Sequence, residues 1–326
     1  MKKKNLLRNL FIAASLFSAV ATANARNKYL FVYFTGNSPQ QEQVSYAISD
    51  DGFNYTPLNN GKPVISSDSI ARTGCVRDAH ILRTKNGEYL MVLTDMRSSL
   101  GWSSNRGIVL LKSRDLIHWQ HHTVHFPEKY AGKNFANVTR VWAPQTIYDK
   151  KAGKYMVYFS LLTNDGTIPY DRVYWAYAND DFSDLEGEPK VLFDFHAPAI
   201  DTDIVQDKKG EYHLFFKTEQ EGAHKGIRQY VFRDLHNPAS WTLLDGFCEQ
   251  TKNNVEGAGV FPLIGGGWCL MYDCYTSGHY QFTKSDDLRT FHWVADTKTK
   301  GAFTPRHGTV IQITPKEYKR LMKHYK

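Results

Sequence analysis

The sequence has few cysteines, little net charge outside its first 25 residues, and no apolar run long enough to cross a membrane. Its 326 residues include four cysteines, too few for a disulfide-stapled domain of this size. None of them forms the Cys-x-x-Cys spacing of a zinc or redox site. No segment approaches the roughly 20 apolar residues that a membrane-spanning helix needs. These absences exclude a disulfide scaffold, a zinc module and an integral membrane protein.

The N-terminal segment has the pattern of a secretory signal peptide. Four basic residues precede an apolar stretch over residues 10–20, and Ala23-Asn24-Ala25 matches a cleavage site. We therefore expect residues 1–25 to be removed and the mature protein to be exported, to the periplasm or the extracellular space, without membrane insertion. Without these four basic residues the formal charge falls from +7 to +3, which argues against nucleic acid as a partner.

Four modules of the chain repeat one order of elements. Each starts with a short segment carrying an acidic or polar group, passes a glycine turn, and enters an apolar strand led by an aromatic residue. The opening segments are Val76-Arg77-Asp78-Ala79-His80, Val141-Trp142-Ala143-Pro144-Gln145, Ile200-Asp201-Thr202-Asp203 and Val255-Glu256-Gly257-Ala258. A third strand, an aspartate turn and often a tryptophan-led fourth strand follow. Four-stranded antiparallel modules in tandem predict a β-propeller.

The two ends of the chain supply a fifth module. Residues 29–34 match the aromatic second strand and residues 44–48 the third, while residues 306–311 provide the missing first strand. Closing the ring with strands from both ends removes exposed sheet edges. The predicted fold is all-β, one five-bladed propeller domain over residues 26–326. A plain β-sandwich would not explain polar groups recurring at one register.

A short helix should follow the last strand. Thr314 to Glu317 has the pattern of a capping box, with Pro315 at the first helical position. The pattern predicts a helix over residues 315–326 that closes the base of the propeller.

The repeat also predicts where chemistry takes place. First strands line a propeller's axis, so a shared register would bring Asp78, Asp201 and Glu256 into one funnel. Hydrolysis of an acetal needs a carboxylic acid to protonate the leaving oxygen and a carboxylate to activate water. A third carboxylate raises the pKa of the acid by like-charge repulsion. Three converging carboxylates therefore indicate a glycoside hydrolase.

On these motifs the chain resembles the family 43 glycoside hydrolases, five-bladed propellers that act mainly on arabinose- and xylose-containing glycans. The resemblance runs from about Tyr29 to Ile313. It rests on five motifs in order: Arg77-Asp78, Trp142-Ala143-Pro144, Ile200-Asp201, Val255-Glu256-Gly257 and Arg306-His307-Gly308. It implies inversion of configuration, with Asp78 as general base, Asp201 as modulator of the acid's pKa and Glu256 as general acid. It requires no cofactor, although some members hold an axial calcium ion beside the histidine that His307 matches.

Other residues are expected to bind substrate. They are Arg77, Trp142, Gln145, Asp203, Arg306 and His307. The family pattern is not complete, because Ala79 and Thr202 stand where proline often follows the aspartates, and Gln145 stands where many members carry an acid. Asp203 shares the face of Asp201 on an extended strand and is the alternative modulator.

Two further groups of reactive side chains are interpreted as structural. Histidines 118, 121, 122 and 125 fall on an outer strand and are split between its faces, so no metal site is predicted there. Cys75 lies three residues before Asp78 and is interpreted as a small buried apolar residue rather than a nucleophile.

We expect an exported exo-glycosidase acting on an oligosaccharide or polysaccharide, either an α-L-arabinofuranosidase or a β-xylosidase. Another furanosidase, such as a galactofuranosidase, or an endo-arabinanase stays open; long loops near residues 100–106 and 163–172 favour a closed pocket and exo action. A retaining fructan-cleaving propeller is disfavoured because its Asn-Asp-Pro and Glu-Cys motifs are missing. From another class, a carbohydrate-binding propeller without catalysis is the alternative, against which the intact Asp78 and Glu256 weigh.

Overall fold

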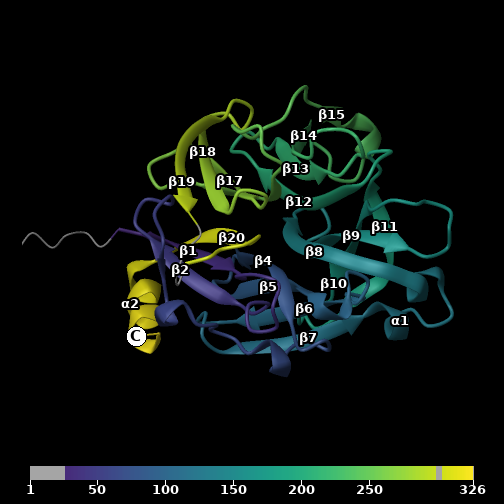
Figure 1. The fold of residues 1–326 in the computed structure, drawn as a ribbon, viewed down its shortest axis with the longest axis horizontal. Coiled ribbons are helices and arrows are strands. Elements are labelled where there is room, and N and C mark those ends of the chain that lie inside the picture. Colours follow the sequence, from purple (N-terminus) through teal and green to yellow (C-terminus); the bar gives the residue numbers. More distant parts are fainter. Residues whose placement is uncertain (1–25, 299–302, 326) are drawn as a thin grey trace, which may run out of the picture.

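The computed structural model describes residues 26–298 and 303–325, which form five four-stranded antiparallel sheets arranged in a ring (Figure 1). The predicted signal peptide lies outside these residues. Blade 1 contains β4 (Val76–Arg83), β5 (Tyr89–Asp95), β6 (Gly107–Ser113) and β7 (Trp119–His125). Blade 2 contains β8 (Val138–Asp149), β9 (Lys154–Thr163), β10 (Arg172–Ala178) and β11 (Leu185–Phe193). Blade 3 contains β12 (Ala199–Gln206), β13 (Tyr212–Thr218), β14 (Ile227–Phe232) and β15 (Thr242–Leu243).

Blade 4 contains β16 (Glu256–Pro262), β17 (Trp268–Cys274), β18 (His279–Ser285) and β19 (His292–Lys298). Blade 5 combines the two ends of the chain, in the order β20 (Thr309–Ile313), β1 (Lys28–Tyr33), β2 (Ser45–Ser49) and β3 (Thr56–Pro57). The predicted five-bladed, all-β propeller, closed by strands from both termini, is confirmed. Short helical segments lie between strands: α1 (Phe126–Lys129), η1 (Asn59–Gly61), η2 (Ser67–Ser69), η3 (Ser98–Leu100), η4 (Asn134–Asn137) and η5 (Pro238–Ser240).

The aromatic second strands explain why the blades pack. Tyr29, Phe31 and Tyr33 of β1 are buried and contact Met271 and Tyr280 of blade 4 in one apolar cluster. Burying a large apolar side chain contributes about 1.5–3 kcal/mol, so these strands hold neighbouring blades together. Among the described residues no helix is long and apolar enough to cross a membrane.

The C-terminal helix α2 (Pro315–His324) has the predicted capping box. The Thr314 hydroxyl accepts from the Glu317 backbone N–H at 3.3 Å, and the Glu317 carboxylate accepts from the Thr314 N–H at 2.7 Å. Glu317 also pairs with Arg83 of β4, at 2.6 Å. Burial raises the pKa of Glu317, but the bonds from Arg83 and Tyr89 outweigh it and lower this pKa to about 2. The helix is thereby tied to blade 1.

A bulge interrupts the first strand of blades 1 to 4. It separates Arg77 from His80, Trp142 from Gln145, Ile200 from Asp203, and Glu256 from Gly259. One residue in each bulge has a left-handed backbone, at φ 55° for Asp78, 46° for Ala143, 52° for Asp201 and 65° for Gly257. Non-glycine residues adopt this conformation at a cost, often at functional sites.

The bulges correct the predicted register. Asp78 and Asp201 occupy equivalent positions, but their counterpart in blade 4 is Gly257, and Glu256 is equivalent to Arg77. The prediction of one register for all three carboxylates is therefore wrong by one residue at Glu256. A bulge breaks the alternation of faces, so neighbouring residues such as Arg77 and Asp78 both line the same cavity.

Glycine is required at the blade 4 bulge. A Cβ atom on Gly257 would lie 2.7 Å from Cγ of His307, which no normal contact allows. The missing side chain lets His307 pack directly against the bulge of blade 4.

Candidate active site

One end of the propeller axis holds a cavity of about 630 Å³, called the funnel below. It is lined by the early residues of the first strands, including seven of the nine predicted site residues. These seven are Arg77, Asp78, Trp142, Asp201, Glu256, Arg306 and His307. Asp78 comes from blade 1, Asp201 from blade 3 and Glu256 from blade 4, so strands far apart in sequence bring the three carboxylates together.

Asp78 is held as a carboxylate. Its Oδ2 accepts from the Thr94 hydroxyl at 2.7 Å, and that hydroxyl in turn accepts from the Ala143 N–H at 2.9 Å. Its Oδ1 lies 3.4 Å from Nδ1 of His307. Burial raises the pKa of Asp78, but the hydrogen bond and charge of His307 outweigh burial and hold this pKa below its ordinary value. Asp78 is therefore ionised at neutral pH, as a general base must be.

The pKa of Asp201 is raised, whereas that of Asp78 is lowered. Its Oδ2 accepts from the Gly257 N–H at 3.0 Å, and its Oδ1 lies 3.8 Å from Nδ1 of His307. Burial raises the pKa of Asp201 to about 6; the charge of His307 opposes this shift and the charge of Glu256 adds to it. The carboxylates of Asp201 and Glu256 are therefore close enough for the charge of Glu256 to shift the pKa of Asp201.

His307 bridges the two aspartates as a cation. Burial alone would lower the pKa of this imidazole, but the charges of Asp201 and Asp78 raise it to about 9. Nδ1 of His307 faces both carboxylates, at 3.4 Å from Asp78 and 3.8 Å from Asp201. A calcium ion beside His307 stays a prediction.

Glu256 is held by two cations. Its Oε2 accepts from the Lys217 ammonium at 3.0 Å and its Oε1 from the Arg306 guanidinium at 2.9 Å. Arg306 also donates to Asp273, and Lys217 to Glu219. Both carboxylate oxygens thus accept from cationic donors.

Sequence reasoning missed Thr94, Lys217 and Asp273. They occupy the same place in their blades, directly paired with Arg77, Ile200 and Glu256 respectively. Each stands five residues after the aromatic residue that leads its second strand, at Tyr89, Tyr212 and Trp268. A polar residue that recurs five positions after the leading aromatic residue in three modules is the signal that would have found them.

Gln145 and Asp203 do not line the funnel, contrary to the prediction. Gln145 is buried and accepts from the Tyr158 hydroxyl at 3.2 Å. Asp203 lines a second cavity of about 460 Å³, formed by the later residues of the first strands at the other end of the axis. Its Oδ2 accepts from the Val260 N–H at 2.7 Å. The bulge after Ile200 breaks the alternation that would have kept Asp203 beside Asp201.

Asp203→Asn should stabilise the protein above about pH 4, with the full effect above about pH 7. Burial raises the pKa of Asp203 to about 7, above the ordinary value near 3.9. Its ionised form therefore opposes folding, and stability falls as pH rises from about 4 towards 7. We expect the melting temperature to rise at pH 8, by on the order of 2–4 °C for each kcal/mol gained, and to stay unchanged at pH 4. Thermal unfolding that showed the same change at both pH values would contradict this.

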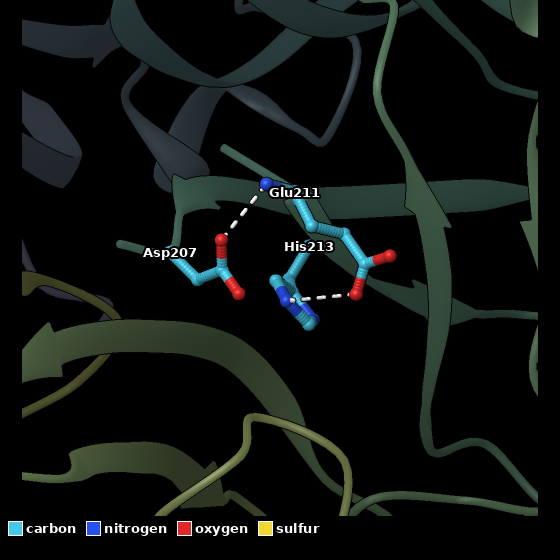
Figure 2. A group of neighbouring side chains, drawn as sticks. All are labelled: Asp207, Glu211 and His213. Atoms are coloured by element: carbon cyan, nitrogen blue, oxygen red, sulfur yellow. Dashed lines mark hydrogen bonds and ion pairs between the residues drawn. The ribbon is translucent and has the colours of Figure 1, made fainter. Parts of the chain in front are cut away.

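One group of metal-ligand type occurs among the residues that the structure describes. Asp207, Glu211 and His213 place their ligand atoms within 4.8 Å of one another (Figure 2). The Gln229 amide donates to a backbone carbonyl at 2.7 Å and lies 3.0 Å from Nδ1 of His213, which must therefore accept. The imidazole proton then sits on Nε2, facing Glu211 at 3.6 Å, and Glu211 is also paired with Arg289. Since Nδ1 of His213 accepts from Gln229 and Nε2 carries the proton, this imidazole has no free lone pair for a metal, and we do not assign a metal site to the group.

Known proteins match this chain in sequence and in fold. A family model described as a probable glycosyl hydrolase domain, related to family 43, matches residues 24–319. The chain belongs to the family 43 glycoside hydrolases. Among curated relatives, an α-L-arabinofuranosidase of Bifidobacterium longum subsp. longum is 30% identical over 207 residues. That match covers 57% of this family 43 chain but 19% of the Bifidobacterium enzyme, so the chain spans about one fifth of its relative's length.

Solved family 43 structures share the propeller. A thermostable family 43 glycoside hydrolase is 18% identical, with a TM-score of 0.55 over 74% of this chain and 80% of its own. A family 43 enzyme of Xanthomonas citri in complex with xylose is 14% identical, with a TM-score of 0.54 over 72% of this chain and 77% of its own. At these sequence identities the similarity shows a shared fold and nothing more.

Proposed function

We propose that this family 43 chain is an inverting exo-glycosidase that removes terminal arabinose or xylose residues from a glycan. Asp78 is the general base, Glu256 the general acid and Asp201 the modulator of the acid. One observation carries the proposal: Asp78 and Glu256 line the same funnel from blades 1 and 4, which are not neighbours in the ring. Inversion needs an acid and a base on opposite sides of the sugar.

The proposed reaction is a single displacement. Asp78 accepts a proton from water while the water oxygen bonds to the anomeric carbon. Glu256 gives its proton to the glycosidic oxygen as the carbon–oxygen bond breaks, so that a hemiacetal of inverted configuration and an alcohol leave. The bonds from Thr94 and His307 fix the orientation of Asp78. Exchange of one proton with solvent then restores both carboxyl groups.

The charges in the funnel favour a neutral sugar. Among the described lining residues, every cationic side chain lies against a carboxylate. These cations are Arg77, Arg140, Lys217, Lys225, Arg306 and His307. A substrate carboxylate would therefore compete with existing ion pairs, whereas arabinose and xylose carry no charge. The name of the Bifidobacterium relative supports α-L-arabinofuranosides as the first substrates to test.

A panel of nitrophenyl glycosides tests the proposed function. We expect release of nitrophenol from the α-L-arabinofuranoside or the β-D-xyloside. Hydrolysis of a galactofuranoside alone would move the assignment to another furanosidase, and internal cleavage of linear arabinan would make the enzyme an endo-arabinanase. Binding of arabinan or xylan without any hydrolysis would make the protein a carbohydrate-binding propeller.

Asp201→Asn should move the alkaline limb of the pH–rate profile to lower pH, by on the order of one pH unit. The charges of Asp201 and Glu256 interact, and the N–H of Gly257, the residue after Glu256, donates to Asp201 at 3.0 Å. A negative charge beside a general acid favours the protonated form of that acid, so removing the charge should shift the loss of the acid form to lower pH. The measurement is kcat/KM from pH 4 to 9, with Asp203→Asn as the control. A limb that moved with Asp203→Asn and not with Asp201→Asn would exchange the two roles.

Export belongs to the same proposal. It is supported by the basic and apolar pattern of residues 1–25 and by the Ala23-Asn24-Ala25 site. A glycosidase acting on polymeric glycans has to meet its substrate outside the cytoplasm.

A further inference from the structure

Trp102 stands out among the funnel residues because its side chain is largely in water. It lies on the loop between β5 and β6, lines the funnel, and is 54% exposed. The side chains of Asp78, Asp201 and His307 are 13%, 10% and 4% exposed. Trp102 therefore belongs to the mouth of the funnel, and these three residues belong to its floor.

The loop that carries Trp102 is fixed at both ends. At its start the Ser98 N–H donates to both carboxylate oxygens of the buried Glu42, each at 3.1 Å, and the Ser98 hydroxyl donates to the Asn37 carbonyl at 2.8 Å. At its end the Asn105 carbonyl accepts from the Val141 N–H at 2.9 Å. Val141 is the residue before Trp142, so the loop is bonded to the strand that carries the second tryptophan of the funnel.

The ring of Trp102 is also held in orientation. The Arg77 guanidinium lies over it, 5.4 Å from the ring centroid, and is itself paired with Glu42 at 3.1 Å. The Trp142 ring meets it edge to face, at 6.5 Å and an interplanar angle of 87°. A rigid, half-exposed aromatic surface at the mouth of a cavity loses little entropy when a ligand stacks on it.

We propose that Trp102 forms an outer subsite that stacks on the leaving-group sugar, the residue attached to the sugar being removed. This inference rests on the proposed function. When the terminal sugar lies on the floor beside Asp78, the next sugar emerges at the mouth, where Trp102 is presented. The apolar C–H face of a neutral sugar matches an aromatic face, and Trp102 selects substrates whose leaving group has such a face.

A comparison of three variants tests the subsite. The probes are arabinobiose or xylobiose, chosen by the sugar that the nitrophenyl panel identifies, and the corresponding free monosaccharide as an inhibitor. Trp102→Ala should raise KM for the disaccharide by about tenfold, and leave the inhibition constant of the monosaccharide unchanged. Trp102→Phe should keep most of the affinity, because it retains an aromatic face. Trp293→Ala is the matched control, since Trp293 is 57% exposed on the outer strand β19.

Each contrary outcome has its own meaning. If Trp102→Ala and Trp293→Ala had the same KM for the disaccharide, the outer subsite would be overturned. The proposed function would still stand, provided that the unaltered enzyme hydrolysed the disaccharide. Equal increases in the disaccharide KM and the monosaccharide inhibition constant would place Trp102 against the terminal sugar and also overturn the subsite. If the unaltered enzyme hydrolysed neither arabinobiose nor xylobiose, both the proposed function and the subsite would be overturned.

Discussion

Asp78→Asn should lose activity on every glycoside, with kcat/KM falling by about 10³-fold or more. An inverting enzyme must deprotonate its water whatever the leaving group is, so an activated aryl glycoside cannot bypass the loss. Asparagine keeps the size of the side chain and an oxygen for the Thr94 hydroxyl, but it cannot accept a proton. The measurement is kcat/KM on a nitrophenyl glycoside and on the matching disaccharide.

Asp203→Asn is the matched control for that experiment. It makes the same change on a first strand, but in the cavity at the other end of the axis. We expect it to keep close to full activity. An Asp78→Asn enzyme within tenfold of the unaltered protein would remove Asp78 from the role of base.

Glu256→Gln should separate good leaving groups from poor ones. We expect kcat/KM to fall by about 10³-fold on the disaccharide, whose departing sugar needs a proton, and by roughly tenfold or less on a dinitrophenyl glycoside, whose departing group does not. The cations around Glu256 keep other partners, because Lys217 pairs with Glu219 and Arg306 with Asp273. Equal losses of kcat/KM on both substrates would show that Glu256 is not the acid. An unchanged melting temperature of the variant would show that its fold is intact.

The architecture was accessible from the sequence because its signals are local and repeated. Aromatic-led strands, glycine turns and aspartate turns recur along the chain, and the strand at residues 306–311 had no partner except the N-terminal module. Blade number and closure follow from such counting. The convergence of Asp78, Asp201 and Glu256 followed from the repeat in the same way.

The exact register was not accessible, because a backbone conformation decides it. The bulges place Asp78, Ala143, Asp201 and Gly257 at left-handed φ and shift the faces that follow. A prediction that assumed strict alternation of side chains along each strand therefore misplaced Asp203. It also aligned Glu256 with Asp78, one residue away from its equivalent Arg77. Aspartate and glycine tolerate this conformation better than most residues, but Ala143 gives no such sign.

The two ion pairs of Glu256, with Lys217 and Arg306, could not be predicted for a different reason. Lys217, Glu256 and Arg306 come from three blades, and their contacts exist once the ring is closed. Sequence spacing carries no information about pairs so far apart. The register of Lys217 and Asp273 on their second strands was nevertheless visible, and aligning the modules on their leading aromatic residues would have singled both out.

The configuration of the first product tests the central claim most directly, because it reports whether water attacks across the funnel from Asp78 while Glu256 protonates the departing oxygen. Proton NMR of a purified sample, recorded in the first minutes of hydrolysis, resolves the two anomers of the released sugar before they equilibrate. We predict that the initial product has the configuration opposite to that of the glycoside. A first product with the same configuration as the substrate would contradict it, because retention requires a carboxylate to attack the sugar itself.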